Sequence, residues 1–180
     1  ESAIFTIGKK KNVEPKDVDA AEALSVATRI QALDAEKKQC GAERIVLSSE
    51  LDRLKSWGDI DPSSLSDLEA KGYEISFYEM PKAEYKLLDE SIKTVRIDVT
   101  KSTVRFMLLK SNKEELDEDV SSLNVYRLAL PQISTSNMKQ RLLELSTRMD
   151  EIDETISANA CYVESIKKAV QSVEKEIEFE

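Results

Sequence analysis

The fold is decided by one stretch, MKQRLLELSTRMDEIDETISANACYVESIKKAVQSVEKEI, residues 138–177. Its apolar side chains recur at steps that alternate between four and three residues. This spacing keeps a narrow stripe on one face of a helix and is typical of the seam of a left-handed coiled coil. The stretch therefore predicts one helix from Ser134 to Glu180. The seam positions are Met138, Leu142, Leu145, Met149, Ile152, Ile156, Asn159, Val163, Ile166, Val170, Val173 and Ile177.

A matching stripe lies near the N-terminus, with Lys37 and Arg44 as polar breaks. Pro15 and Asp17 indicate where this helix begins, and Trp57-Gly58 indicate where it ends. Two such helices with other structure between them predict an antiparallel hairpin that is closed by its own seams. The stripe consists of Ala23, Val26, Ile30, Leu33, Lys37, Cys40, Arg44, Leu47, Leu51 and Leu54.

The segment between the two helices has a different pattern. A short helix from Pro62 precedes an alternating strand over 73–79. After it we expect a helix from Pro81, two hairpin strands (95–99 and 104–108), a helix over 112–120 and a strand over 123–130. The order strand, helix, strand, strand, helix, strand is the ferredoxin-like pattern.

The predicted fold class is therefore α+β: a long antiparallel coiled-coil hairpin with an inserted ferredoxin-like (βαββαβ) lobe at its tip. The expected divisions are a lead-in over 1–16, a first coiled-coil helix over 17–58, the lobe over 59–131 and a second coiled-coil helix over 132–180.

Composition argues against several classes of function. The formal charge is −9, which is unfavourable for binding nucleic-acid phosphates, and the chain has no histidine, the commonest general base and metal ligand. The two cysteines lack metal-site spacing, and the predicted register keeps them apart as free thiols. We expect no catalytic residue, metal or cofactor. A predicted free sheet face carries charges rather than the stacking aromatics of RNA-binding sheets; its members are Arg96, Asp98, Arg105 and Met107.

Trp57 is the sole tryptophan and stands where the first helix meets the lobe. Two interpretations remain open: a hydrophobic plug at this junction, or a binding hot spot for a partner, since tryptophan is enriched in such sites. The chain has no apolar run long enough to cross a bilayer. It starts without Met and stops inside a helical pattern, so we expect it to be a piece of a longer polypeptide.

Short landmarks along the chain resemble the cytoplasmic half of subunit I of V-type and A-type ATPases, the prokaryotic counterpart of the eukaryotic a subunit. The landmarks are Lys9 to Asp17, Leu54 to Asp59, Ser64-Leu65, Gly72, Glu79-Met80-Pro81, the paired strands from Arg96 to Leu109, and Leu128-Ala129-Leu130-Pro131. The resemblance covers essentially the whole chain and rests on element order, without an invariant catalytic motif.

The resemblance implies a stator component of a rotary ATPase that translocates protons or sodium ions. Such a chain would be a rigid arm on the cytoplasmic face of the membrane, attached to peripheral-stalk subunits E and G and to other subunits of the complex. The membrane-embedded C-terminal half of the family, which holds the ion path, would lie outside this sequence. The sequence alone leaves the direction of ATP turnover open.

Two alternatives come from other classes of protein. The first is a ligand-sensing ferredoxin-like domain on a dimerising coiled coil, and the second is a coiled-coil arm that grips nucleic acid. The acidity of the chain opposes the second. The first predicts self-association through the helices, whereas a hairpin closed on itself predicts a monomer.

Overall fold

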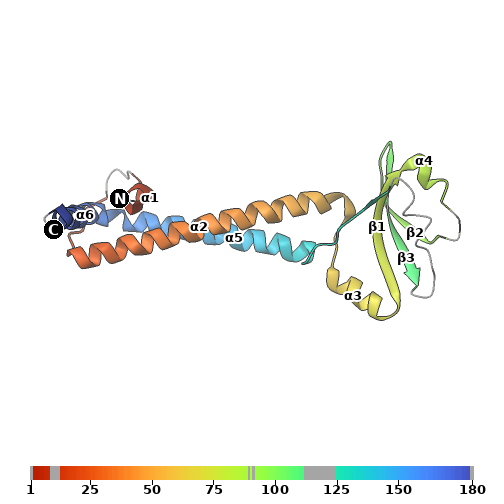
Figure 1. Ribbon diagram of the computed structural model, residues 1–180, viewed down its shortest axis with the longest axis horizontal. Helices are drawn as coiled ribbons and strands as arrows, with labels where there is room; N and C mark the ends of the chain where they lie inside the picture. The colour runs from red at the N-terminus through yellow and green to blue at the C-terminus, as the bar shows by residue number, and fades with distance from the viewer. Residues whose placement is uncertain (1, 9–12, 89, 91, 112–124, 179–180) are drawn as a thin grey trace. The chain divides into compact units, whose positions relative to one another are not determined.

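The computed structural model describes residues 2–8, 13–88, 90, 92–111 and 125–178. It contains long helices and a four-stranded antiparallel sheet, which confirms the predicted α+β class (Figure 1). The chain divides into two compact units. We call Glu1–Val46 with Leu142–Glu180 the helical unit, and Leu47–Arg141 the sheet unit. Each is described by itself.

The first long helix, α2, is continuous from Ala20 to Leu54. Its start lies later than Pro15 or Asp17, because Asp19 Oδ1 accepts the Glu22 amide at 2.8 Å and so satisfies a free N–H of the first turn. A 3₁₀ turn, Lys55–Trp57, follows α2 and ends at Gly58. The φ of Gly58 is 81°, in the left-handed region that glycine adopts without a steric cost.

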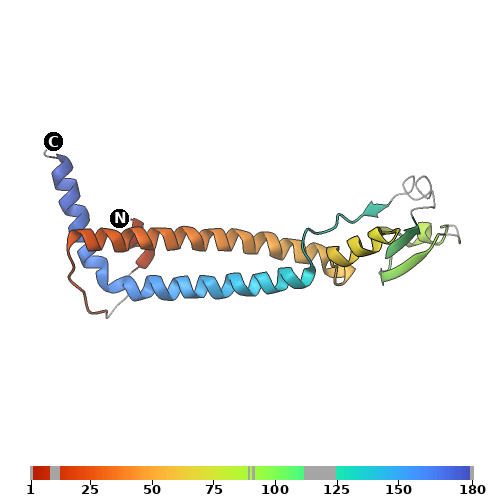
Figure 2. The same ribbon diagram turned by 90° about the horizontal axis from the view of Figure 1, so that it is seen from below.

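The prediction of one helix over 134–180 was wrong. The structure has α5 (Thr135–Ala158), a 3₁₀ turn (Asn159–Tyr162) and α6 (Val163–Glu178), and α6 leaves the direction of α5 (Figure 2). A seam needs a partner on the facing helix, and α2 begins only at Ala20. Beyond the turn, α6 instead packs against α1 (Ser2–Ile7).

In the helical unit, α2 and α5 run antiparallel side by side (Figure 2). One apolar cluster joins α1, α2, α5 and α6, and burying it stabilises the unit at about 25 cal/mol per Å² of apolar surface. Its buried members are Ala3, Ile7, Ala23, Ile30, Ile152, Ile156, Ile166 and Ala169.

The sheet unit contains the strands β1 (Tyr73–Pro81), β2 (Thr94–Val99), β3 (Thr103–Ser111) and β4 (Tyr126–Arg127), in the spatial order β2-β3-β1-β4. All neighbouring pairs are antiparallel. Besides the end of α2 and the start of α5, this unit contains α3 (Pro62–Ala70), with Asp61 as N-cap, and α4 (Lys82–Tyr85), which is shorter than the sequence indicated. The predicted helix over 112–120 lies outside the described residues, as does the beginning of the predicted last strand.

Neither face of the sheet is free where β3 crosses it, so the prediction of an open face was wrong. Val104 and Phe106 pack with Met80 on one face, and Met107 packs against a second cluster that contains Trp57 and Phe77 on the other. The end of the first long helix therefore covers the face that the sequence left open.

The strand β2 has a register shift between Arg96 and Asp98. The alternating pattern of its sequence had predicted both side chains on one face. Arg96 pairs with Phe106, whereas Asp98 pairs with Arg105, so Arg96 and Asp98 lie on opposite faces. One extra residue, Ile97, causes the change, and the predicted common face of the two charged side chains does not exist.

Among the described residues, no helix combines the length and the apolar composition that crossing a bilayer requires.

Candidate functional site

The candidate site of this chain is a set of packing surfaces, and the first is the predicted seam. In the helical unit, Ile30 of α2 and Ile152 of α5 are 0% exposed and belong to one cluster. In the sheet unit, Leu54 is buried beside Trp57, and Leu47 and Leu51 pack on the same cluster. All of the named seam positions are buried or half-buried: Ile30, Leu33, Leu47, Leu51, Leu54, Leu142, Leu145, Ile152, Ile156, Asn159, Val163 and Ile166.

Two ion pairs connect α2 with α5 beside the seam. Arg148 binds Glu36 through two hydrogen bonds of 2.6 and 3.0 Å. These bonds lower the pKa of the Glu36 carboxyl and raise the pKa of the Arg148 guanidinium, since each favours the charged form. Lys37, a polar break in the sequence pattern, reaches Asp153 at 2.6 Å. Each ion pair joins one residue of α2 to one residue of α5, so together they favour one register of the two helices.

Lys37 and Asn159, polar members of the two stripes, bind different partners. Lys37 pairs with Asp153, and the Asn159 side-chain amide donates to the Thr155 carbonyl within its own helical segment at 2.7 Å. Asn159 stands at the first position of the 3₁₀ turn, so its polar group serves the end of α5 rather than the partner helix.

The segment before α2, which we call the strap (residues 16–18), is bound to the turn between α5 and α6. The Lys16 amide donates to the Cys161 carbonyl at 2.9 Å. The Ser165 hydroxyl donates to the Lys16 carbonyl at 2.8 Å and accepts the Val18 amide at 3.3 Å. Ser165 is only 3% exposed, so these bonds are shielded from water. Sequence reasoning missed the strap because backbone acceptors leave no pattern in a sequence.

Two side chains add to the strap. Lys168 of α6 reaches Asp17 at 3.1 Å, and the Lys16 ammonium lies 5.9 Å from the centroid of the Tyr162 ring. The ion pair is exposed and is therefore a weak contact. The backbone and Ser165 bonds carry most of the attachment.

Trp57 is 6% exposed and meets the Phe77 ring edge-on, with the centroids 6.3 Å apart. The Arg105 guanidinium lies 5.8 Å from the Trp57 ring centroid and pairs with Glu79 and Asp98. A tryptophan enclosed in this way presents little surface to another protein, which favours its interpretation as a plug. The sequence pattern predicted Arg105 on an open face of the sheet. In the structure its guanidinium instead lies over the Trp57 ring.

The end of the 3₁₀ turn after α2 and the start of α5 are joined by Thr135, which is 3% exposed. Its hydroxyl donates to Asp59 and accepts the Ile60 amide, both at 3.2 Å, while the Thr135 amide donates to the Ile60 carbonyl. Hydrogen bonds from Lys139 and then from Thr135 lower the pKa of Asp59. A serine hydroxyl caps α5, since Ser134 accepts the Asn137 amide.

Large side chains of the sheet unit are exposed, among them Leu87 and Tyr126. Leu87 is 82% exposed, and Tyr126, on the edge strand β4, is 52% exposed. Beside β4 lies a cavity of about 400 Å³ that Arg127 lines, and Arg127 also binds Ser76 at 3.1 Å.

Within the described part of the chain, no three His, Cys, Asp or Glu side chains are arranged to hold a metal ion. Cys40 and Cys161 are free thiols, as predicted. The described side chains of the site form packing surfaces and ion pairs.

Comparison with known proteins gives one relationship to report. No family model matches the chain. The chain is 26% identical over 175 residues to "V-type ATP synthase subunit I 1" of Treponema pallidum (strain Nichols). The alignment covers 97% of this chain but 27% of that relative, so the chain spans about a quarter of the relative's length.

Proposed function

Since the chain is a homologue of a V-type ATP synthase subunit I, as its sequence landmarks indicated, we propose that it is a structural part of an ion-translocating rotary ATPase. In this proposal it is a stator arm on the cytoplasmic face of the membrane, which links the membrane sector to peripheral stalks. The observation that carries the proposal is the pairing of α2 with α5, because two helices joined by a common core and cross-helix ion pairs resist bending better than a linker.

The finer architecture belongs to the same proposal. We infer an antiparallel coiled coil with a ferredoxin-like lobe at its tip. The strand order β2-β3-β1-β4 with antiparallel neighbours supports the lobe, because the βαββαβ pattern produces this order. The proposed divisions remain 1–16, 17–58, 59–131 and 132–180, with the second coiled-coil helix bent at residues 159–162.

We propose that the chain is not itself an enzyme and needs no cofactor. Its lack of histidine and the surface position of its charged pairs support this. Its task would be to transmit force between attachment points while the rotor turns. The ion could be a proton or sodium, and the ion path would belong to a membrane-embedded part outside this sequence.

The expected partners are peripheral-stalk subunits E and G, and the expected attachment surface is the lobe. A photo-cross-linking residue at Leu87 or Tyr126 of the sheet unit should capture an E–G heterodimer. The matched control is Leu143, 69% exposed on α5 in the helical unit, where we expect no capture. Binding should be lost when residues 60–131 are deleted. Unchanged binding, or capture at Leu143 alone, would contradict the proposed attachment.

The alternative, a ligand-sensing domain on a dimerising coiled coil, requires the helices to pair between copies. Here α2 and α5 pair within one chain, which favours the stator arm. Light scattering in dilute solution separates the two, since the arm should be monomeric and the sensor dimeric.

A further inference from the structure

Two groups bind backbone carbonyls at the bend between α5 and α6: the Asn159 side-chain amide, from within the helix, and the Lys16 amide, from outside it. Helices bend sharply at proline, at glycine pairs or at π-bulges, or where another group enters the hydrogen-bond ladder. Residues 138–178 contain neither proline nor glycine. The seam also keeps its four-three alternation from Ile152 through Val163 to Ile177. The apolar stripe is therefore that of one unbroken helix, with Asn159 as its polar member.

The strap provides a cause from outside the helix, in addition to the Asn159 side chain. The Lys16 amide enters the ladder and donates to the Cys161 carbonyl, inside the 3₁₀ turn Asn159–Tyr162. One turn later, Ser165 binds the strap at two points, the Lys16 carbonyl and the Val18 amide. The break thus coincides with the place where an external donor takes a helix carbonyl.

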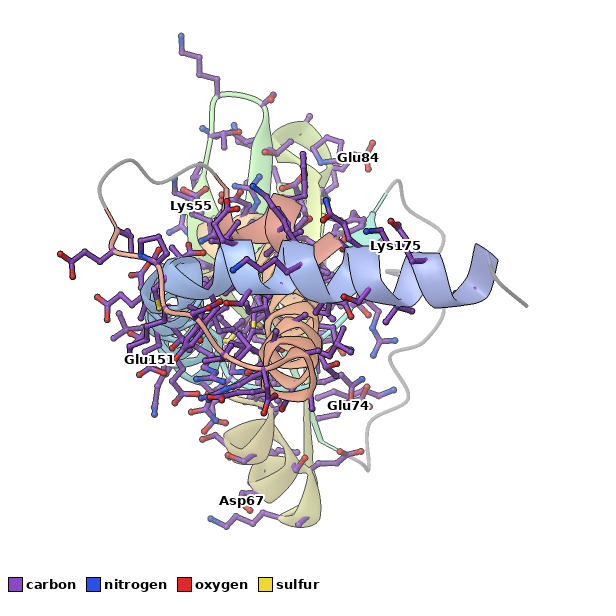
Figure 3. The ribbon with its side chains drawn as sticks, turned by 90° about the vertical axis from the view of Figure 1, so that its left-hand side faces the viewer. Lys55, Asp67, Glu74, Glu84, Glu151 and Lys175 are labelled. Carbon is purple, nitrogen blue, oxygen red and sulfur yellow. The ribbon has the colours of Figure 1, made fainter. Side chains whose placement is uncertain are left out.

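We propose that the strap is a conformational latch. With the strap seated, α6 is held at an angle across the start of α2, as Figure 3 shows. With the strap released, residues 159–162 become α-helical, and α5 and α6 merge into one straight helix. Mid-helix 3₁₀ segments are frequent positions of hinges, and this one is controlled by a segment far away in the sequence.

The latched state buries Ile166 and Ala169 with α1 but leaves Val173 41% and Ile177 69% exposed, although both follow the same stripe. The bent helix therefore covers only the first half of its apolar face. A straight helix would continue the stripe of α5 without interruption and could offer this whole face to one partner.

The test uses the full chain with two spin labels and a distance measurement by pulsed electron paramagnetic resonance. In a background with Cys40 and Cys161 replaced by alanine, labels are placed at Glu154 of α5 and Lys175 of α6, which are both exposed. The ruler is a second pair, 21 residues apart like the first, at the exposed Ala21 and Ala42 of the continuous α2. A straight helix gives about 32 Å between Cα atoms over this span.

Two independent variants release the strap. Lys16→Pro removes the amide that binds Cys161, with Lys16→Ala as its matched control, because alanine keeps the amide. Ser165→Ala removes both hydroxyl contacts, with Ser172→Ala as its control, because the Ser172 hydroxyl binds the Lys168 carbonyl of its own helix. Thermal unfolding followed by circular dichroism tests whether each variant is folded. If Lys16→Pro is unfolded, the distance measured for Ser165→Ala decides the test.

The parent and both controls should give a 154–175 distance shorter than the ruler. Release should lengthen it to the ruler's value. A distribution that stays at the parent distance, or that broadens without reaching the ruler's value, would overturn the latch. Because the isolated chain is measured without stalk subunits, failure here leaves the proposed stator role untouched, and failure of stalk binding leaves the latch untouched.

Discussion

The two long helical stretches of this chain were predicted from the same spacing rule and yet differ in continuity. The first stretch carries Lys37 and Arg44 on its stripe and Gly41 near its middle, but α2 is unbroken over 35 residues. The second has a nearly perfect stripe with one asparagine, but it is divided into α5 and α6. The regularity of a stripe therefore predicts which face is buried, and not where a helix ends.

The difference has a physical reason in what each helix packs against. The polar break at Lys37 is satisfied by a partner, since Lys37 pairs with Asp153. The C-terminal stretch extends past the start of α2 at Ala20, where the facing helix is replaced by the strap and by α1. Tertiary partners thus decide continuity, as they do for most helices in proteins.

The largest expected effect comes from the shared core. If α2 owes its stability to its partner, truncating either side of the interface should cost the same. We expect Ile30→Ala and Ile152→Ala each to lower the free energy of unfolding by about 2–5 kcal/mol, because both side chains are fully buried in one cluster. Urea unfolding followed by circular dichroism measures this. The control is Leu143→Ala on the exposed face of α5, expected within about 0.5 kcal/mol of the parent. A loss of stability in only one of the two variants would contradict a shared core in which α2 and α5 stabilise each other.

A smaller effect is expected where α5 begins. Thr135→Val keeps the shape of the side chain but leaves the buried Ile60 amide without its acceptor. The expected cost is about 1–3 kcal/mol. Thr147→Val is the matched control, because the Thr147 hydroxyl is exposed and binds only the Leu143 carbonyl in its own helix. Equal costs for the two variants in the same urea assay would mean that the Thr135 contacts do not hold this end of the helix pair.

The glycine within α2 offers a gain in stability. A methyl group at Gly41 would meet no atom within 4 Å, so Gly41→Ala should stabilise the chain by about 0.5–1 kcal/mol through helix propensity. Gly58→Ala should act in the opposite direction by about 1–2 kcal/mol, because its φ of 81° is unfavourable for a residue with a Cβ. Midpoints of thermal unfolding that move in the same direction for both would show that α2 is not helical at residue 41.

The smallest effect concerns the exposed ion pair between Glu36 and Arg148. The pKa of Glu36 is lowered from its ordinary value of 4.5, so the pair contributes stability above the unfolded pKa. That contribution is lost as the pH falls through the lowered folded pKa. The small difference in urea midpoint between the parent and Glu36→Gln at pH 7 should therefore vanish as the pH falls from about 5 towards 2. The exposed Glu154 of α5, changed to Gln, serves as the control. A difference that persists in acid would assign the effect to something other than this charge.

Much of the fold followed from local signals that act within a few residues. Pro62 predicted the start of α3, and Asp61 caps it by accepting the Ser63 amide. The alternation over 73–79 predicted β1, and the paired strands β2 and β3 were recognised from their spacing. These features depend on side chains next to the backbone groups that they satisfy, so they are visible in the sequence.

The features that were missed depend on distant groups. The extra residue at Ile97 moves Asp98 to the opposite face from Arg96, and a period-two pattern carries no sign of it. Arg105 was expected on an open surface, but Trp57 at the end of the first helix covers it. The attachment of Lys16 to Cys161 uses two backbone groups, which every residue except proline possesses, so residue types could not have indicated it.

The two thiols give the chain a built-in means of observation. Cys40 is buried against the core side of α2, whereas Cys161 is partly open at the bend. A maleimide fluorophore added to the native chain should therefore react at Cys161 first and report on that corner of the molecule, with no residue changed. Labelling of Cys40 would then signal that the two helices have separated.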